Sequence, residues 1–73
     1  MNIEELKKRL INGEEFVFYF NHEEYWIGRT IDCFYLSRVK DSNVQEYKDV
    51  EDLINKATIE NRIFSDVFPE IDL

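Results

Sequence analysis

The fold is decided by residues 15–31, which read EFVFYFNHEEYWIGRTI. Aromatic and aliphatic side chains alternate on both sides of the polar segment at residues 21–24. Alternation with a period of two is typical of β-strands, and a short polar segment between two such runs predicts a hairpin. We therefore expect two antiparallel strands, over residues 15–20 and 25–31.

Both faces of this predicted hairpin are apolar. The faces are the same whether the turn has two or four residues. Antiparallel pairing puts Phe16, Phe18, Tyr25 and Ile27 on one face. It puts Val17, Tyr19 and Trp26 on the opposite face. The first possibility is that the N-terminal helix covers one face and the C-terminal segment the other. The second is that one face stays partly open as a binding surface. In that case Tyr19, Trp26 and Tyr35 are the expected anchors of an interface with a partner or a second copy.

A helix is predicted before the hairpin, over residues 3–12. Asn2 is a suitable N-cap, with Glu5 three residues later in the capping-box position. Apolar residues then recur at helical spacing, and Gly13 suits the left-handed position that follows a helix.

After the hairpin we expect a third strand over residues 33–39 and a short edge strand over 44–47. A helix is predicted over 50–57, followed by one or two helical turns over 63–68 that Pro69 ends. The chain is therefore expected to be one α+β domain, residues 1–73, with an N-terminal helix, an antiparallel three- to four-stranded meander and one or two short C-terminal helices.

The charge is strongly acidic and unevenly distributed. The net charge is −7, and residues 41–73 carry nine acids against three bases, whereas residues 1–40 carry seven against six. Direct nucleic-acid binding is not expected, because phosphate contacts need clustered cations. The basic run at residues 7–9 is expected to be a solvated helix face, with Glu4 paired to Lys8 and Glu5 to Arg9.

No catalytic, cofactor or metal site is predicted. The one histidine, His22, lies in the hairpin turn, and the one cysteine, Cys33, reads as a small core residue. The only two glycines do not form a phosphate-binding loop, and paired carboxylates need a cleft for which so short a chain has little room. No apolar run is long enough to span a bilayer and no export signal precedes the first helix, so we expect a cytoplasmic protein.

The acidic second half suggests an alternative function. Its carboxylates could imitate nucleic-acid phosphates and occupy the basic groove of a nucleic-acid-handling enzyme. The candidate surface consists of Asp41, Glu46, Asp49, Glu51 and Asp52.

Residues 16–25 and 47–54, followed by Ile59 and Ile63, resemble small uncharacterised proteins of low-GC Gram-positive bacteria and their prophages. In those proteins a short helix precedes a strand–turn–strand hairpin, and an acidic helical segment closes the chain. The resemblance implies the same α+β order and a mobile-element setting, and it assigns no functional residue. The sequence thus predicts a small acidic non-catalytic interaction or regulatory module that acts through a protein partner or as a homodimer.

Overall fold

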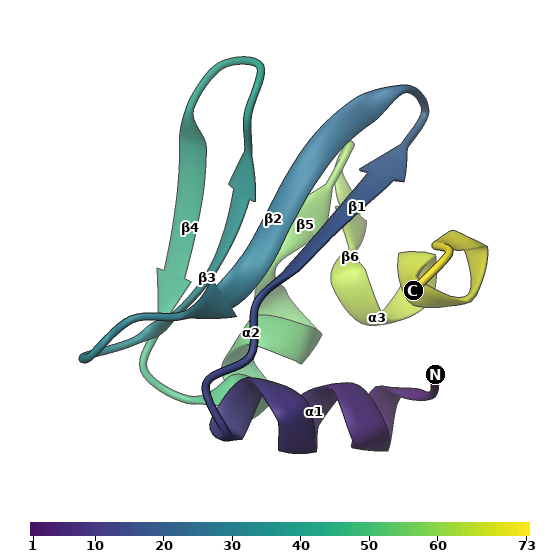
Figure 1. The fold of residues 1–73 in the computed structure, drawn as a ribbon. Helices are drawn as coiled ribbons and strands as arrows, with labels where there is room; N and C mark the ends of the chain where they lie inside the picture. Colours follow the sequence, from purple (N-terminus) through teal and green to yellow (C-terminus); the bar gives the residue numbers. More distant parts are fainter.

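The computed structural model of residues 1–73 places a four-stranded antiparallel sheet beside a layer of helices (Figure 1). The elements in the first part are α1 (Ile3–Ile11), β1 (Phe16–Phe20), β2 (Glu23–Arg29), β3 (Phe34–Arg38) and β4 (Asn43–Tyr47). The elements in the second part are α2 (Val50–Lys56), β5 (Thr58–Ile59), β6 (Arg62–Ile63), α3 (Phe64–Val67) and the 3₁₀ helix η1 (Phe68–Glu70). The predicted α+β order is confirmed, and the edge strand brings the sheet to four strands.

The sheet is a meander in the order β1-β2-β3-β4. Asn21 and His22 form the two-residue turn between β1 and β2, with φ of 51° and 67°. Two consecutive residues with positive φ are typical of a type I′ turn, whose twist matches that of the flanking strands. The shorter of the two predicted loops is therefore correct, and the register pairs Val17 with Trp26 and Phe18 with Tyr25.

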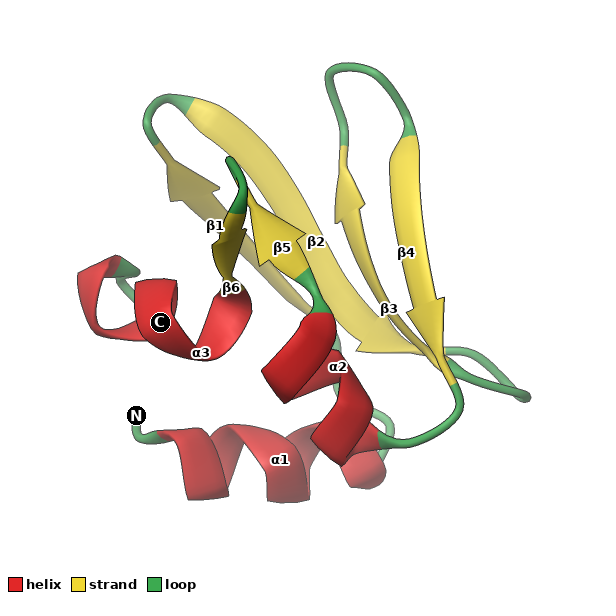
Figure 2. Ribbon diagram, turned by 180° about the vertical axis from the view of Figure 1, so that it is seen from behind, coloured by secondary structure: helices red, strands yellow, loops and turns green.

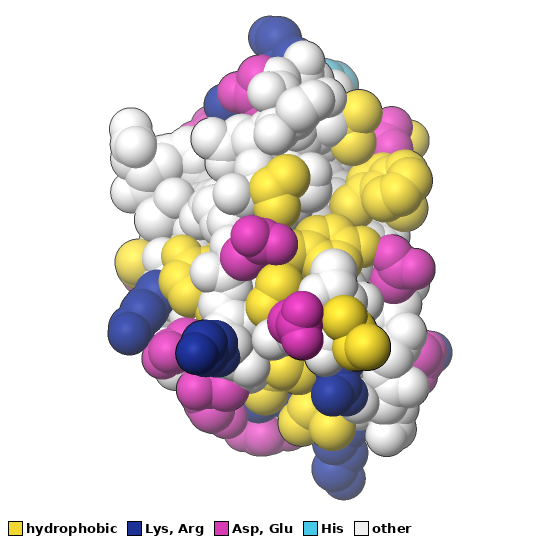
Figure 3. Space-filling model, turned by 90° about the vertical axis from the view of Figure 1, so that its left-hand side faces the viewer, with side chains coloured by type: hydrophobic (Ala, Val, Ile, Leu, Met, Phe, Trp, Pro, Cys, Tyr) yellow, Lys and Arg dark blue, Asp and Glu magenta, His cyan; other side chains and the backbone are white.

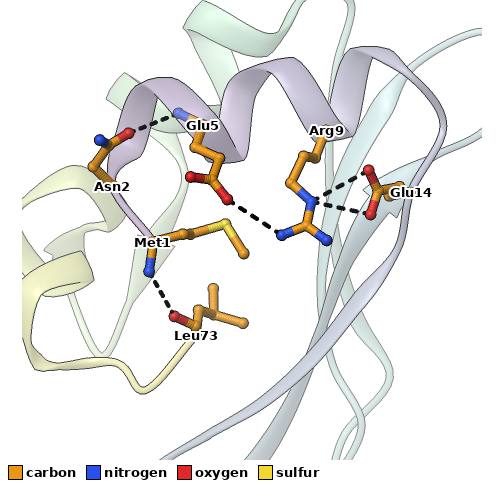
Figure 4. Close-up of polar contacts among 6 residues, drawn as sticks. All are labelled: Met1, Asn2, Glu5, Arg9, Glu14 and Leu73. Atoms are coloured by element: carbon orange, nitrogen blue, oxygen red, sulfur yellow. Dashed lines mark hydrogen bonds and ion pairs between the residues drawn. The ribbon is translucent and has the colours of Figure 1, made fainter.

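The ends of α1 follow the capping prediction. The Asn2 side chain accepts a hydrogen bond from the Glu5 amide at 2.8 Å, and Gly13 adopts a φ of 91° just beyond the helix (Figure 4). Arg9 pairs with Glu5 as expected and also with Glu14.

The other expected pair of α1 is wrong. Glu4 pairs with Lys7 instead of Lys8, and Lys7 also reaches Glu51 of α2 at 3.0 Å. Two acidic partners draw the Lys7 ammonium to the seam between the two helices. In Figure 4 the amino group of Met1 is seen to bond the carbonyl oxygen of Leu73, at 3.0 Å.

The C-terminal part differs from the prediction in two respects. A small hairpin, β5–β6, follows α2, and its turn residues Glu60 and Asn61 have φ of 52° and 67°. Pro69 does not end the last helical turns, because it lies inside the 3₁₀ helix η1. It stands in the first turn of η1, where a residue needs no backbone amide proton for helical hydrogen bonding. The helix predicted at residues 50–57 is present as α2. Its N-cap is Asp49, whose side chain accepts a hydrogen bond from the Asp52 amide at 2.9 Å.

The Gln45 side chain ties the edge strand β4 to the C-terminal hairpin. Its amide oxygen accepts from the Thr58 amide and its amide nitrogen donates to the Thr58 carbonyl, both at 2.8 Å. The side chain therefore bonds β5 as a neighbouring strand would. This contact fixes the hairpin on one side of the sheet.

All of the helices lie on one face of the sheet. Seen from behind (Figure 2), α2, α3 and the β5–β6 hairpin lie in front of the strands, with α1 below. The sheet contributes to the core through alternate side chains, namely Phe18, Phe20, Tyr25, Ile27, Phe34 and Leu36. Of the two possibilities predicted from the sequence, the one in which the N-terminal helix covers one face and the C-terminal segment the other is therefore wrong. The C-terminal segment packs beside α1 and leaves the second face uncovered.

Candidate functional site

The uncovered face of the sheet, called the open face below, carries large apolar side chains in water. Val17, Trp26 and Val44 stand in one row across the strands, and their exposed fractions are 51%, 45% and 54%. Tyr19 stands in the next row and is 64% exposed. A half-solvated antiparallel sheet normally carries polar groups on its outer face. The open face is therefore an exposed apolar surface of the kind that marks an interaction site.

Glu24 holds the two exposed aromatic residues together. It lies opposite Tyr19 in the register and two residues before Trp26 on the same side of β2. One carboxylate oxygen accepts from the indole Nε1 at 2.6 Å, and the other accepts from the Tyr19 hydroxyl at 3.5 Å. The indole and phenol thus have their polar atoms turned to one carboxylate, which orients both rings.

Tyr35 lies across Gly28 and reaches the segment before β1. Its hydroxyl donates to Glu15 at 2.5 Å. A Cβ on Gly28 would lie 2.7 Å from the Glu15 Cγ and 2.9 Å from the Tyr35 hydroxyl, so only glycine leaves room for this contact. Partial burial, together with the bonded carboxylate, raises the pKa of Tyr35 to about 12.

Within its four strands, the open face has carboxylates but no lysine or arginine. Its positions alternate along the strands, and none of those inside β1–β4 is lysine or arginine. The first cation in this alternation is Lys48, which follows β4 and lines a surface hollow with Glu46 and Cys33. Glu15, Glu24 and Glu46 lie there, and none of the three takes part in an ion pair. Seen from the β4 edge (Figure 3), acidic side chains lie between exposed apolar ones. The surface is therefore both apolar and negative.

The structure brings together two of the three predicted anchors. Tyr19 and Trp26 share Glu24, whereas Tyr35 is half-buried one row beyond Trp26 and bonds Glu15. All three side chains belong to the open face, because their positions alternate with those of the core residues.

The five predicted acidic residues do not form one uncompensated surface. Asp41 pairs with Arg38, Glu51 with Lys7 and Asp52 with Lys56. Asp49 is occupied as the N-cap of α2, and only Glu46 lies on the open face. Helix capping, one pair within α2, one pair between α1 and α2 and one pair at the turn after β3 thus use most of this charge.

Sequence reasoning missed Val44, Glu15 and Glu24 as parts of the site. A signal for Val44 was present in the sequence, because a four-strand meander places it in the same row as Ser37 and Trp26. For Glu24 the signal was its spacing of two from Trp26, which puts both side chains on one face of a strand. The register across four strands, which only the fold supplies, was needed to find them.

The remaining chemical candidates do not converge. His22 is exposed in the β1–β2 turn. Cys33 is half-buried and outside the core, 3.2 Å from the Thr30 hydroxyl, so its predicted place in the core is wrong. It precedes β3 and its position falls on the side of Tyr35, away from the core.

A polar hollow of about 300 Å³ lies on the covered side of the sheet. It is lined by Tyr25, Arg38, Asn43, Gln45, Thr58, Glu60 and Asn61. Most of its polar groups are already bonded within the protein, Arg38 to Asp41 and Gln45 to Thr58, although the buried Tyr25 hydroxyl has no partner. The open face, with exposed apolar groups and carboxylates outside any ion pair, is the better candidate site.

Comparison with protein-family models, with curated proteins and with solved structures found no match. None of the helices has the length and apolar character needed to cross a membrane.

Proposed function

We propose that this protein is a non-catalytic interaction module and that the open face of its sheet is the docking surface for a protein partner. The observation that carries the proposal is the exposure of Tyr19 and Trp26 beside Val17 and Val44 on one uncovered sheet face. Aromatic residues are enriched at the energetic centres of protein interfaces, because each buries a large area at a small cost in side-chain entropy.

The shape of the surface supports a macromolecular partner over a small molecule. Small-molecule sites are concave and enclose most of the ligand. The two exposed aromatic residues stand instead on the outer face of a four-stranded sheet, with their polar atoms held by Glu24. Rings oriented before binding lose less freedom when a partner covers them.

The test compares the wild-type chain with the double variant Tyr19→Ala/Trp26→Ala in affinity capture of partners. The expected result is that proteins captured by the wild type are lost from this variant, while its circular dichroism spectrum stays unchanged. A matched control, Ile11→Ala/Ile31→Ala, removes exposed apolar side chains outside the open face. The proposal fails if the open-face variant keeps the partners, or if the control variant loses them equally.

Nucleic-acid mimicry has less support as a function. Three of the five carboxylates proposed for it are neutralised in ion pairs, so they do not present a phosphate-like array. A mimic must compete with nucleic acid for its target. A captured partner that binds nucleic acid and this protein at the same time would therefore exclude the idea. The cytoplasmic and mobile-element settings remain predictions.

A further inference from the structure

We propose that the partner on the open face is a cationic protein segment, whose lysine or arginine side chains meet Glu15, Glu24 and Glu46 while its apolar side chains cover Trp26 and Tyr19. This inference rests on the proposed function, and it adds the chemistry of the partner. The occupant is a different protein and not a second copy of this chain.

The arrangement of charge around the apolar row is the first argument. Val17, Trp26 and Val44 lie in the central row of the open face. Glu24 stands on one side of this row, two residues before Trp26, which is about 7 Å along a strand. Glu15 lies on the other side of the row, beside Gly28, and two strands beyond Gly28 lies Glu46.

These carboxylates enclose the apolar residues rather than clustering at one point. Glu15 and Glu46 are separated by three strand spacings, about 14 Å. An apolar centre within a charged rim is the usual anatomy of a protein interface. Here the rim has only one sign of charge, so it selects a partner of the opposite sign.

None of these three carboxylates forms an ion pair within the chain. The eight ion pairs of the protein lie elsewhere: five involve residues of α1 or α2, and the others join Arg38 to Asp41, Lys40 to Glu23 and Arg62 to Glu70. Glu15 and Glu24 accept hydrogen bonds from neutral aromatic donors, which orient them and leave their charge in place. A partner that covers them must supply cations, because a carboxylate buried without one is costly.

The same reasoning excludes a second copy. A twofold interface brings one surface against itself, so residues of the open face would meet the open face of the other chain. Such an interface would enclose both sets of Glu15, Glu24 and Glu46, six carboxylates, with Lys48 beyond the end of β4 as the one cation at the edge of each face. Each chain also has a net charge of −7, which opposes association at low salt.

Trp26 offers a further contact to a cation. Its Nε1 proton is directed to Glu24, and almost half of the side chain is exposed to water. The face of an indole ring attracts ammonium and guanidinium groups, and tryptophan does so more strongly than tyrosine or phenylalanine. A cation seated between this ring and the Glu24 carboxylate would interact with both.

The experiment uses Trp26 as its own reporter, since the chain has one tryptophan. The full-length protein is titrated with three synthetic amphipathic peptides that share leucine positions and carry lysine, glutamate or serine at all the others. We expect a saturable change in tryptophan fluorescence with the lysine peptide alone, weakened as salt screens the charges. Analytical ultracentrifugation of the protein alone is expected to show a monomer.

A matched pair of variants separates the open face from the overall charge. Glu15→Gln/Glu24→Gln/Glu46→Gln removes three charges from the open face and keeps hydrogen-bond acceptors. Glu60→Gln/Asp66→Asn/Asp72→Asn removes three charges elsewhere. We expect roughly tenfold weaker binding of the lysine peptide by the first variant and nearly unchanged binding by the second.

Each contrary result has a distinct meaning. Any of four results would overturn the cationic partner. The two triple variants bind the lysine peptide equally, the wild type binds all three peptides equally, or it binds none of them. The fourth result is a dimer that the Tyr19→Ala/Trp26→Ala variant abolishes. The double variant lacks Trp26, so isothermal titration calorimetry measures its peptide binding. If it loses the peptides that the wild type binds, or the dimer, the open face is still a docking surface. If it binds the lysine peptide as the wild type does, the docking surface itself is wrong.

Discussion

The two faces of the sheet are built from the same kinds of residue but have opposite surroundings. On the covered face, Phe18 and Tyr25 stack with ring centroids 5.3 Å apart, and Phe64 of α3 packs on Phe18. On the open face, Tyr19 and Trp26 remain in water and are joined through Glu24. The comparison teaches that an aromatic residue in a strand becomes core or exposed surface according to where the helices pack.

Charge divides between the faces in the same way. Arg38 and Glu23 belong to the covered face, because their positions alternate with those of open-face residues. Arg38 forms an ion pair with Asp41, and Glu23 forms one with Lys40. The carboxylates of the open face have none. Arg38 and Glu23 are thus compensated within the chain, whereas Glu15, Glu24 and Glu46 have no cation of the chain within ion-pair distance.

The largest expected effect comes from two neighbours on β1. Phe18→Ala removes a fully buried ring and is expected to cost about 3–5 kcal/mol, close to the whole stability of a domain of this size. Tyr19→Ala, one residue later on the open face, is expected to change stability by less than about 1 kcal/mol. Urea denaturation followed by circular dichroism measures both. Equal losses would contradict the division of the faces.

A second pair of neighbours tests the same contrast on β4. Gln45→Ala removes both hydrogen bonds to the Thr58 backbone and is expected to cost about 1–2 kcal/mol, because two backbone groups lose their protein partner. Val44→Ala on the open face serves as the control, with an expected change of less than about 0.5 kcal/mol. Denaturation midpoints provide the measurement, and hydrogen exchange at Thr58 is expected to quicken in the Gln45 variant alone.

Gly28→Ala tests how the open face is organised. The new methyl group must displace Glu15 or Tyr35, so we expect a loss of about 1 kcal/mol and a shift of the Tyr35 pKa from about 12 towards its ordinary value. Absorbance of tyrosinate during an alkaline titration follows that pKa. The shift is expected to be smaller when the substitution is made in a Glu15→Ala chain, where the displaced side chain and the bonded carboxylate are both gone.

The smallest expected effect concerns alkaline pH. Tyr35 has a higher pKa in the folded protein than the ordinary value of 10, so its contribution to stability is present below pH 10 and is lost as the pH rises through about 12. Tyr35→Phe removes this contribution. The difference in unfolding free energy between wild type and variant is expected to shrink from pH 10 to pH 12. A difference that stays constant over this range would contradict the Tyr35–Glu15 contact.

The local elements could be read from residues close together in sequence. The N-cap Asn2, the left-handed Gly13 and the alternation around Asn21 and His22 act within a few positions, so the α1 helix and the β1–β2 hairpin were predictable. The β5–β6 hairpin was missed because strands of two residues have no periodicity to detect, and a glutamate with positive φ at Glu60 is an unusual turn residue.

The candidate site was predictable only in part. Alternation alone put Tyr19, Trp26 and Tyr35 at strand positions away from Phe18. It did not reveal Val44 as a neighbour of Trp26, because that depends on the register of three successive strand pairs. It also did not reveal that Asp41 and Glu51 are neutralised, because their partners are chosen by the turn after β3 and by the contact between α1 and α2.

The sequence by itself determined the α+β order, the strand alternation, the helix caps and the acidic charge, because each of these depends on residue type and short-range spacing. Only the tertiary structure decided which sheet face became the core. Both faces carry aromatic residues, so alternation is symmetric between them, and the choice was made when α1, α2 and α3 packed together on the side of Phe18 and Ile27. That choice left Tyr19 and Trp26 facing water, beside three carboxylates that form no ion pair.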